Sequence, residues 1–139
     1  MSHCAQQIRA WFVTSLTGVS GLPTAHAGYV AQVAAGASSC TVTTTIEEIQ
    51  PATMHTPPID TRRLEVEVLL KAATLDAVDA LGLAAEEALA AATGFPGKEF
   101  EPQRREYQEN VETDRVSVSL TITYAATYDA ARNDLETFK

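Results

Sequence analysis

The feature that most constrains this chain is a long stretch of strict alternation near its C-terminal end. From Arg115 to Tyr128, the even positions are mostly large and apolar, and the odd positions are mostly small and hydroxylated. Successive side chains of a β-strand point to opposite faces of a sheet, so this pattern creates one apolar and one polar face. β-Branched and aromatic residues suit such a surface, and no proline interrupts the stretch. The stretch therefore predicts a long central strand.

Other segments show either the same alternation or helical spacing of apolar residues. Ser2 and Thr74 are suited to cap the two predicted helices. In chain order, the expected elements are a helix at 3–16, strands at 40–49 and 62–72, a helix at 75–93, and strands at 100–111 and 115–128. The order α-β-β-α-β-β predicts an α+β fold, with a four-stranded, mostly antiparallel (mixed) sheet packed by two helices.

The remaining segments are expected to be irregular. Residues 18–39 are mostly small and show no clear periodicity. Residues 51–61 are expected to form a loop, because three prolines break both helix and strand. Residues 129–139 have weak helical spacing and no clear core face. With 139 residues, the chain reads as a single domain, 1–139, in which 129–139 is a C-terminal extension.

Charge and composition exclude several classes of function. The formal net charge is −8, which argues against sequence-independent binding of nucleic acid, because such binding needs a cationic face. The longest apolar runs, such as Ala88–Ala92, are too short to span a membrane. The N-terminal residues lack the pattern of a signal peptide. Cys4 and Cys40 form no spaced motif, which suits a reducing cytoplasm.

Residue patterns that carry chemistry are largely missing. Only His3 and Cys4 approach the spacing of metal ligands, and exposed histidines are the simpler interpretation. Glu86 and Glu87 flank the apolar stripe of a helix, where a solvated face is expected. The sequence shows no glycine-rich phosphate loop and no nucleophile elbow. We therefore expect no catalytic, cofactor-binding or metal-binding residues, and a protein that is not an enzyme.

Three stretches together resemble the tail terminator proteins of long-tailed, non-contractile bacteriophages. The opening helix around Ile8–Leu16, the strand-then-helix run from Arg62 to Leu81, and the closing strand Val116–Tyr124 each resemble the corresponding part of that family. The resemblance covers most of the chain from Gln7 to Tyr128. One departure is that the first strand begins at Cys40 without the Leu-Pro step usual in the family.

The resemblance implies a structural role in a virion, in phages or in gene transfer agents, which carry similar parts. Such proteins form a ring, typically of six copies, at the head-proximal end of the tail, after assembly in the host cytoplasm. The ring stops polymerisation of the tail tube protein and presents a surface for the head completion or connector protein. Genomic DNA passes through its lumen without specific binding, and neither a cofactor nor a membrane is involved. Another connector or tail-completion protein, a monomeric adaptor, and a small ligand-binding or enzymatic domain remain alternatives.

A ring requires surfaces through which copies meet, and the polar segments are the candidates. The basic doublets Arg62-Arg63 and Arg104-Arg105 either balance nearby acids or meet acids of a neighbouring subunit. We expect loop 51–61 and segment 98–113 at subunit contacts, and the surface lining the lumen to be net negative or neutral. The candidate interface residues are Pro57, Pro58, Arg62, Arg63, Asp76, Asp79, Glu86, Arg104 and Arg105.

The expected core joins the apolar faces of the strands at 64–72 and 116–128 to the helix that begins after Thr74. Its predicted members are Val66, Val68, Leu70, Leu75, Val78, Leu89, Val118, Leu120 and Ile122.

Overall fold

The computed structural model describes residues 3–28, 38–51, 58–112 and 115–139. The described elements are α1 (Cys4–Leu16), β1 (Ala25–Ala27), β2 (Ser39–Gln50), β3 (Ile59–Ala72), α2 (Leu75–Ala91), β4 (Glu99–Glu112), β5 (Arg115–Ala131) and β6 (Asp134–Phe138). The mixed α+β class and the two helices are confirmed. The predicted count of four strands is wrong, because the sheet has six strands and the element order gains β1 and β6.

The two additional strands lie in segments where alternation is too short to be recognised. β1 has three residues and lies within 18–39, the region expected to be irregular. It pairs in parallel with residues 40–42 of β2. β6 occupies 134–138, where weak helical spacing had been expected, and it pairs with the end of β5. In β6 the side chain of Phe138 stacks edge-on against Tyr128, with ring centroids 5.6 Å apart. Pairing with the end of the preceding strand, together with this ring contact, thus decides the structure of this tail.

The sheet is organised around β3 and β5, as the alternating stretch predicted. Its strands lie in the order β1-β2-β3-β5-β4, with β6 attached to β5. β3 and β5 are antiparallel and remain in register from Ile59↔Ala131 to Ala72↔Val118. β4 pairs with β5 alone and forms one edge of the sheet. The predicted mostly antiparallel sheet is confirmed, and the β1–β2 pair makes it mixed.

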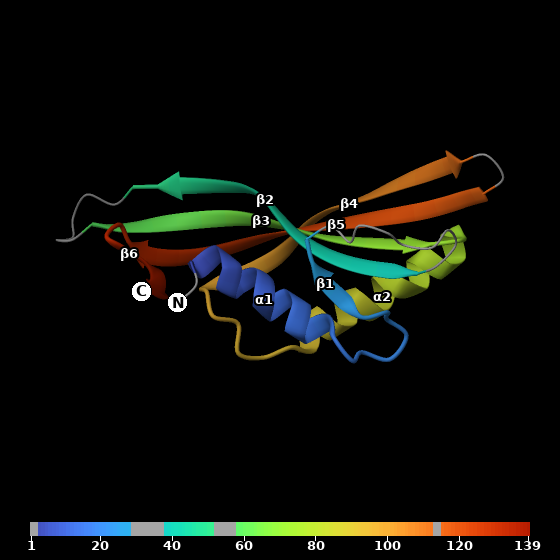
Figure 1. Ribbon diagram of the computed structural model, residues 1–139. Coiled ribbons are helices and arrows are strands. Elements are labelled where there is room, and N and C mark those ends of the chain that lie inside the picture. The colour runs from blue at the N-terminus through green and yellow to red at the C-terminus, as the bar shows by residue number, and fades with distance from the viewer. Residues whose placement is uncertain (1–2, 29–37, 52–57, 113–114) are drawn as a thin grey trace.

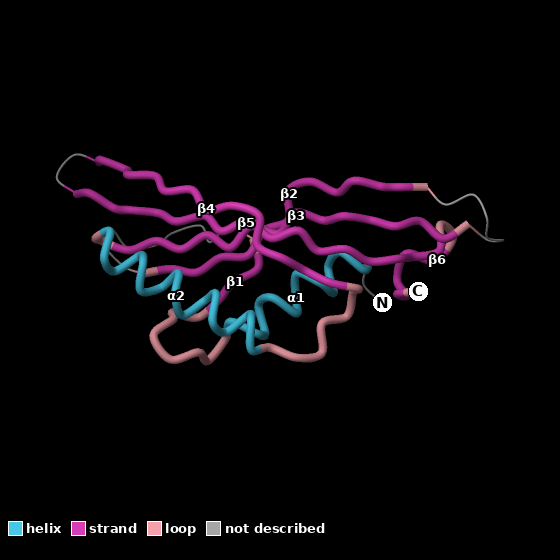
Figure 2. The backbone as a smooth tube through the Cα atoms, turned by 180° about the vertical axis from the view of Figure 1, so that it is seen from behind, coloured by secondary structure: helices cyan, strands magenta, loops and turns pink. Residues whose placement is uncertain are grey.

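Both helices lie on the same face of the sheet, so the molecule has two layers (Figures 1 and 2). In α1, residues at intervals of four turn inward, among them Ile8, Phe12 and Leu16, all fully buried. In α2, Gly82 permits a close approach to β5, because a Cβ there would lie 2.7 Å from Leu120 Cδ2. The core lies between this helical layer and the even-numbered side chains of β3 and β5.

The predicted core is mostly confirmed. Val66, Val68, Leu70, Val78, Leu89, Leu120 and Ile122 are almost completely buried. Val118 is only partly buried and packs against this cluster. Leu75 was wrongly placed in the core: it is the first residue of α2 and is 54% exposed. Only two residues separate the end of β3 from the start of α2, and the first buried residue of the helix is Val78.

The N-cap residue of α2 is the one predicted from the sequence, whereas the N-cap residue of α1 is not. The Thr74 hydroxyl accepts a hydrogen bond of 3.1 Å from the backbone N–H of Ala77, as expected for the N-cap of α2. At α1 the N-cap is His3, whose ring Nδ1 accepts from Ala5 N–H at 3.0 Å. The predicted capping residue Ser2 lies outside the described residues. Neither helix is long and apolar enough to cross a membrane, among the residues that the structure describes.

The sheet is longer than the helical layer and projects beyond it at both ends (Figure 1). β2 and β3 project at one end, beside β6 and the two chain termini. The hairpin of β4 and β5 projects at the other end. In that hairpin, residues 115–117 of β5 pair with β4 but lie beyond the last partner in β3. The molecule therefore presents two chemically different strand arms in opposite directions.

Candidate functional site

The open face of the sheet, which no helix covers, carries a chain of charged side chains. Alternation places Arg63 and Glu65 of β3 on this face, and Arg104 and Glu106 of β4 lie on the same face beyond the intervening strand β5. Glu65 lies between two guanidinium groups, 3.7 Å from Arg63 and 4.0 Å from Arg104. Arg104 Nε is also 3.1 Å from Glu106. The two arginines are therefore balanced by carboxylates of the same subunit.

On the opposite face, a polar cluster links α2 to the edge strand β4. The Arg105 guanidinium lies 3.9 Å from Asp79 and 3.6 Å from Glu86, two carboxylates that lie about two turns apart on α2. The Tyr107 hydroxyl donates a hydrogen bond of 2.6 Å to Asp79. This bond raises the pKa of the Tyr107 hydroxyl above its ordinary value. We call Asp79, Glu86, Arg105 and Tyr107 the α2–β4 bridge.

A second, partly buried polar cluster lies on the helical side of the β2–β3 arm. The Tyr128 hydroxyl donates a hydrogen bond to Glu47, and Arg62 lies 3.7 Å from the same carboxylate. Burial, followed by this hydrogen bond, raises the pKa of the Tyr128 hydroxyl. Arg62 is only 8% exposed, and its Nε has no hydrogen-bond partner among the described residues. Little of Arg62 is thus accessible to a neighbouring molecule.

The nine candidate interface residues occupy several separate places. Arg63 and Arg104 lie on the open face. Arg105, Asp79 and Glu86 form most of the α2–β4 bridge. Arg62 is buried. Asp76 is exposed in the first turn of α2, and Pro58 is partly buried just before β3. Pro57 and most of loop 51–61 lie outside the described residues, although 59–61 already belong to β3. The structure therefore brings three of these residues together, on the helical side.

Asp60 was missed by reasoning from the sequence. It is 2% exposed, and its carboxylate binds the guanidinium of Arg132 through contacts of 2.8 and 3.2 Å. This pair holds the beginning of β3 to the end of β5. The alternation of β3 extends back to Asp60. Because prolines precede it, this position was expected to belong to a loop.

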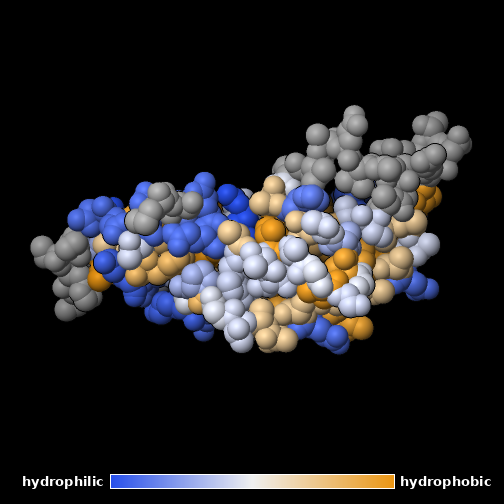
Figure 3. Space-filling model, turned by 60° about the horizontal axis from the view of Figure 1, so that its bottom comes forward, coloured by the Kyte–Doolittle hydropathy of each residue, from blue (hydrophilic) through white to orange (hydrophobic). Residues whose placement is uncertain are grey.

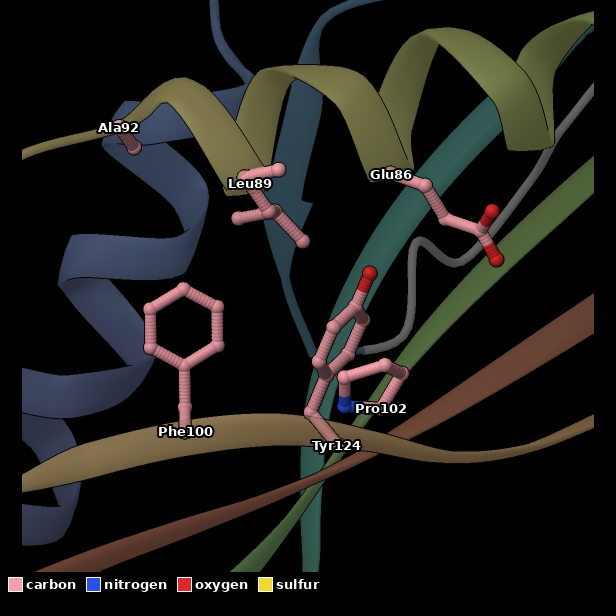
Figure 4. A pocket seen from close by; sticks show the side chains of 7 residues that line it. Glu86, Leu89, Ala92, Phe100, Pro102 and Tyr124 are labelled. Carbon is pink, nitrogen blue, oxygen red and sulfur yellow. The ribbon is translucent and has the colours of Figure 1, made fainter.

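A cavity of about 530 Å³ opens between α2 and β4 (Figure 4). Leu89, Ala92 and Phe100 contribute apolar surface, and Pro102 lies beside Tyr124 on the strand side. The Tyr124 hydroxyl points toward α2, and burial raises its pKa. Glu86, from the α2–β4 bridge, lies at the same end of the cavity as this hydroxyl. The cavity can accept an apolar group that carries a hydrogen-bond donor.

The residues considered as metal ligands are used otherwise. Cys4 and Cys40 are free, buried thiols, and burial raises the pKa of both. His3 uses its ring nitrogen as the helix cap described above. Within the described ranges, no group of three or more His, Cys, Asp or Glu side chains is arranged to hold a metal ion.

Comparison with known proteins finds a similar solved structure but no similar sequence. No protein-family model matches the chain. No curated protein sequence matches it either. A chain in the structure titled "Virion of native gene transfer agent (GTA) particle" is similar over 92% of each chain, at 17% sequence identity and a TM-score of 0.48.

Proposed function

We propose that this chain is a structural virion protein of the tail terminator type. It closes as a ring on the head-proximal end of a tail tube, ends polymerisation of the tube and offers a surface for head attachment. Support comes from the resemblance of its helix, strand-then-helix and closing-strand segments to that family. The structural observation that carries the proposal is the pair of different strand arms projecting from opposite ends of the sheet.

The two arms matter because a closed ring needs a heterologous contact, in which one surface meets a different surface on the next copy. A molecule whose two ends are built from different strands is suited to such a contact. One arm is formed by β2 and β3, and the other by the end of the β4–β5 hairpin. The whole chain, 1–139, serves in this proposal as one domain.

The open face of the sheet has the charge pattern expected of a surface that DNA passes without being held. Its arginines, Arg63 and Arg104, are matched by Glu65 and Glu106. Because stable DNA binding requires unmatched cations that replace phosphate counterions, such a face retains DNA poorly. We therefore assign the lumen of the ring to a net negative or neutral surface of this kind.

Removing the protein from a particle-producing strain tests the proposal. Without a terminator, tail tubes should grow to irregular lengths and fail to join heads, which negative-stain electron microscopy of the particles measures. Adding back the intact gene should restore uniform, joined tails. Tails of normal length joined to heads in the absence of the protein would refute the proposal. Immunogold labelling at the head–tail junction separates a terminator from a connector located on the head side.

The cavity between α2 and β4 favours a second candidate, a small ligand-binding domain. Its apolar walls and the Tyr124 hydroxyl suit a small amphiphilic molecule. Native mass spectrometry of the purified protein should then show a bound small molecule that is lost in Ala90→Trp, which fills the cavity. A wild-type mass equal to that of the bare chain, with or without added cell extract, would exclude this candidate.

A further inference from the structure

The cavity between α2 and β4 arises from two local features of the sequence. At the end of α2, Ala90 and Ala92 carry only methyl groups and leave space that larger side chains would fill. Facing them, the register of β4 against β5 shifts between Pro102 and Arg104, and such an irregularity bends a strand locally. On the helical side of the molecule, apolar residues (orange in Figure 3) gather toward the end where α2 lies. The volume of about 530 Å³ is usual for a small-molecule site.

Aromatic packing fixes the strand side of this cavity. Phe100 lies against Trp11 and Phe95, with ring centroids 5.1 and 5.0 Å apart. The ring of Tyr124 lies 5.6 Å from that of Phe12, and Phe12 is itself fully buried. Both rings that line the cavity are therefore held by neighbours in the core. A preformed wall of this kind lowers the cost of binding, because little has to be ordered when a ligand enters.

The Tyr124 hydroxyl is a buried polar group that the protein leaves without a hydrogen bond. The residue is 3% exposed, and its hydroxyl has no hydrogen-bond partner among the described residues. It points across the cavity toward α2 (Figure 4). A phenylalanine would fill the same place in the aromatic cluster, whereas a buried hydroxyl costs free energy unless something binds it. The hydroxyl therefore marks the point at which a polar group of a ligand is held.

The charge beside this hydroxyl is negative. Glu86 is the one charged side chain among the described residues that line the cavity, and it is 35% exposed. Its neighbour Arg105 lies 3.6 Å from one of the two carboxylate oxygens and is shared with Asp79, 3.9 Å away. One guanidinium thus faces two carboxylates, so the α2–β4 bridge keeps a net negative charge. This charge attracts a cationic group of a ligand and repels an anionic one.

We propose that the α2–β4 cavity binds a small organic amine. Its apolar body lies against Leu89 and Phe100, and its ammonium group donates hydrogen bonds to the Tyr124 hydroxyl and the Glu86 carboxylate. This inference rests on the second candidate function given above, and it names the class of ligand that the cavity takes. It does not depend on the ring function.

Three probes with the same apolar body and different polar groups test the inference. Phenethylamine, phenethyl alcohol and hydrocinnamate are each titrated into the purified full chain at neutral pH, and calorimetry measures the Kd. The amine should bind at least roughly fivefold more tightly than the alcohol, because its hydrogen bonds carry charge. Hydrocinnamate should bind most weakly, since its carboxylate would lie beside Glu86.

Two conservative substitutions locate the amine within the cavity. Tyr124→Phe keeps the ring and removes the hydroxyl, and it should weaken amine binding by roughly fivefold or more. Glu86→Gln should remove the preference for the amine over the alcohol. Asp79→Asn is the matched control, because it takes the same charge from the α2–β4 bridge but does not line the cavity. This control should bind the amine within about twofold of the wild type, since solvent screens the more distant charge. Circular dichroism checks that each variant is folded.

Filling the cavity gives a further check on position. Ala90→Trp should abolish binding of the amine, because the indole occupies the space between α2 and β4. Ala80→Trp adds the same side chain at an exposed position of α2 that does not line the cavity, and it should bind the amine as the wild type does.

Several results would overturn the inference. They are an absence of amine binding to the wild type, hydrocinnamate or alcohol binding as tight as that of the amine, or unchanged amine binding by Tyr124→Phe. Tight binding of the alcohol or the acid that Ala90→Trp removes would refute the amine and leave the ligand-binding candidate standing. The ring function fails on a different observation, namely normal joined tails in particles without the protein.

Discussion

Single buried side chains in the central strand report on its register. Leu120 is fully buried against the helical layer, in contact range of the position of Gly82 in α2. We expect Leu120→Ala to lower the free energy of unfolding by about 2–5 kcal/mol, because it removes apolar contacts and leaves a cavity. Urea denaturation measures the loss. Val111→Ala, at a 75% exposed position of the same hairpin, should change stability by less than about 0.5 kcal/mol.

Cys40 makes stability depend on alkaline pH. Burial raises the pKa of its thiol to about 11, whereas an unfolded cysteine titrates at about 8.5. A raised folded pKa means that the folded state keeps its proton after the unfolded chain has lost it. This contribution is fully present below the unfolded pKa, and up to roughly 3 kcal/mol is lost as pH rises through the folded pKa.

The measurement is the free energy of unfolding between about pH 8 and about pH 9.5, below the titration of unfolded tyrosine. Cys40→Ala should be less stable than the wild type at about pH 8 but should lose less stability on going to about pH 9.5. Val42→Ala, a buried neighbour that does not titrate, should lower stability and leave the pH dependence unchanged. Equal pH dependence in Cys40→Ala and the wild type would contradict this assignment.

At the scale of elements, the beginning of α2 depends on one hydroxyl. The Thr74 side chain accepts from Ala77 N–H and satisfies one of the free donors of the first helical turn. Thr74→Ala should lower the free energy of unfolding by about 1 kcal/mol, as denaturation measures, and Thr74→Ser should restore most of it. A loss in Thr74→Ser as large as that in Thr74→Ala would mean that the methyl group, not the cap, is responsible.

The polar edge strand β4 shows how an element is held without a buried face. Its residues 101–109 are all exposed, and β5 is its only strand partner. The side chains of Arg105 and Tyr107 tie it to α2, and those of Arg104 and Gln103 tie it to β3 across the open face. Charges and the proline at position 102 also suit an edge that must not pair at random.

At the scale of the whole molecule, we propose that the arginine doublet of β4 belongs to a contact between subunits. Arg104→Glu/Arg105→Glu should leave the monomer folded, because the affected ion pairs are largely exposed and contribute about 0–1 kcal/mol each. Ring closure should be impaired, since these cations are expected at a subunit contact. Circular dichroism checks the fold, and electron microscopy of particles measures tail length.

A matched reversal elsewhere separates position from net charge. Lys98→Glu/Lys139→Glu makes the same change in charge at two exposed positions outside the hairpin arm. It should leave tails normal, whereas the arginine variant should give tails of irregular length. Normal particles with the arginine variant would remove this doublet from the interface.

Most of the regular elements could be predicted from the sequence, because their signals are local. Alternation in β3 and β5, helical spacing in α1 and α2, and the Thr74 cap each depend on residues within one element. The buried positions of β3 and β5 followed from the same period, since one face of each strand must face the core.

Only the tertiary structure decided the features that depend on neighbouring elements. β1 and β6 are strands because β2 and β5 offer them hydrogen-bonding edges, and Leu75 is exposed at the first position of α2. The candidate interface arginines were recognisable by type, but their partners were not. Arg62 is buried beside Glu47, and Arg105 meets Asp79 and Glu86 across a gap of many residues in sequence. Ion pairs between separate elements leave no periodic signal in the chain. The pairing of β2 with β3 brings the first pair together, and the packing of α2 against the sheet brings the second set together.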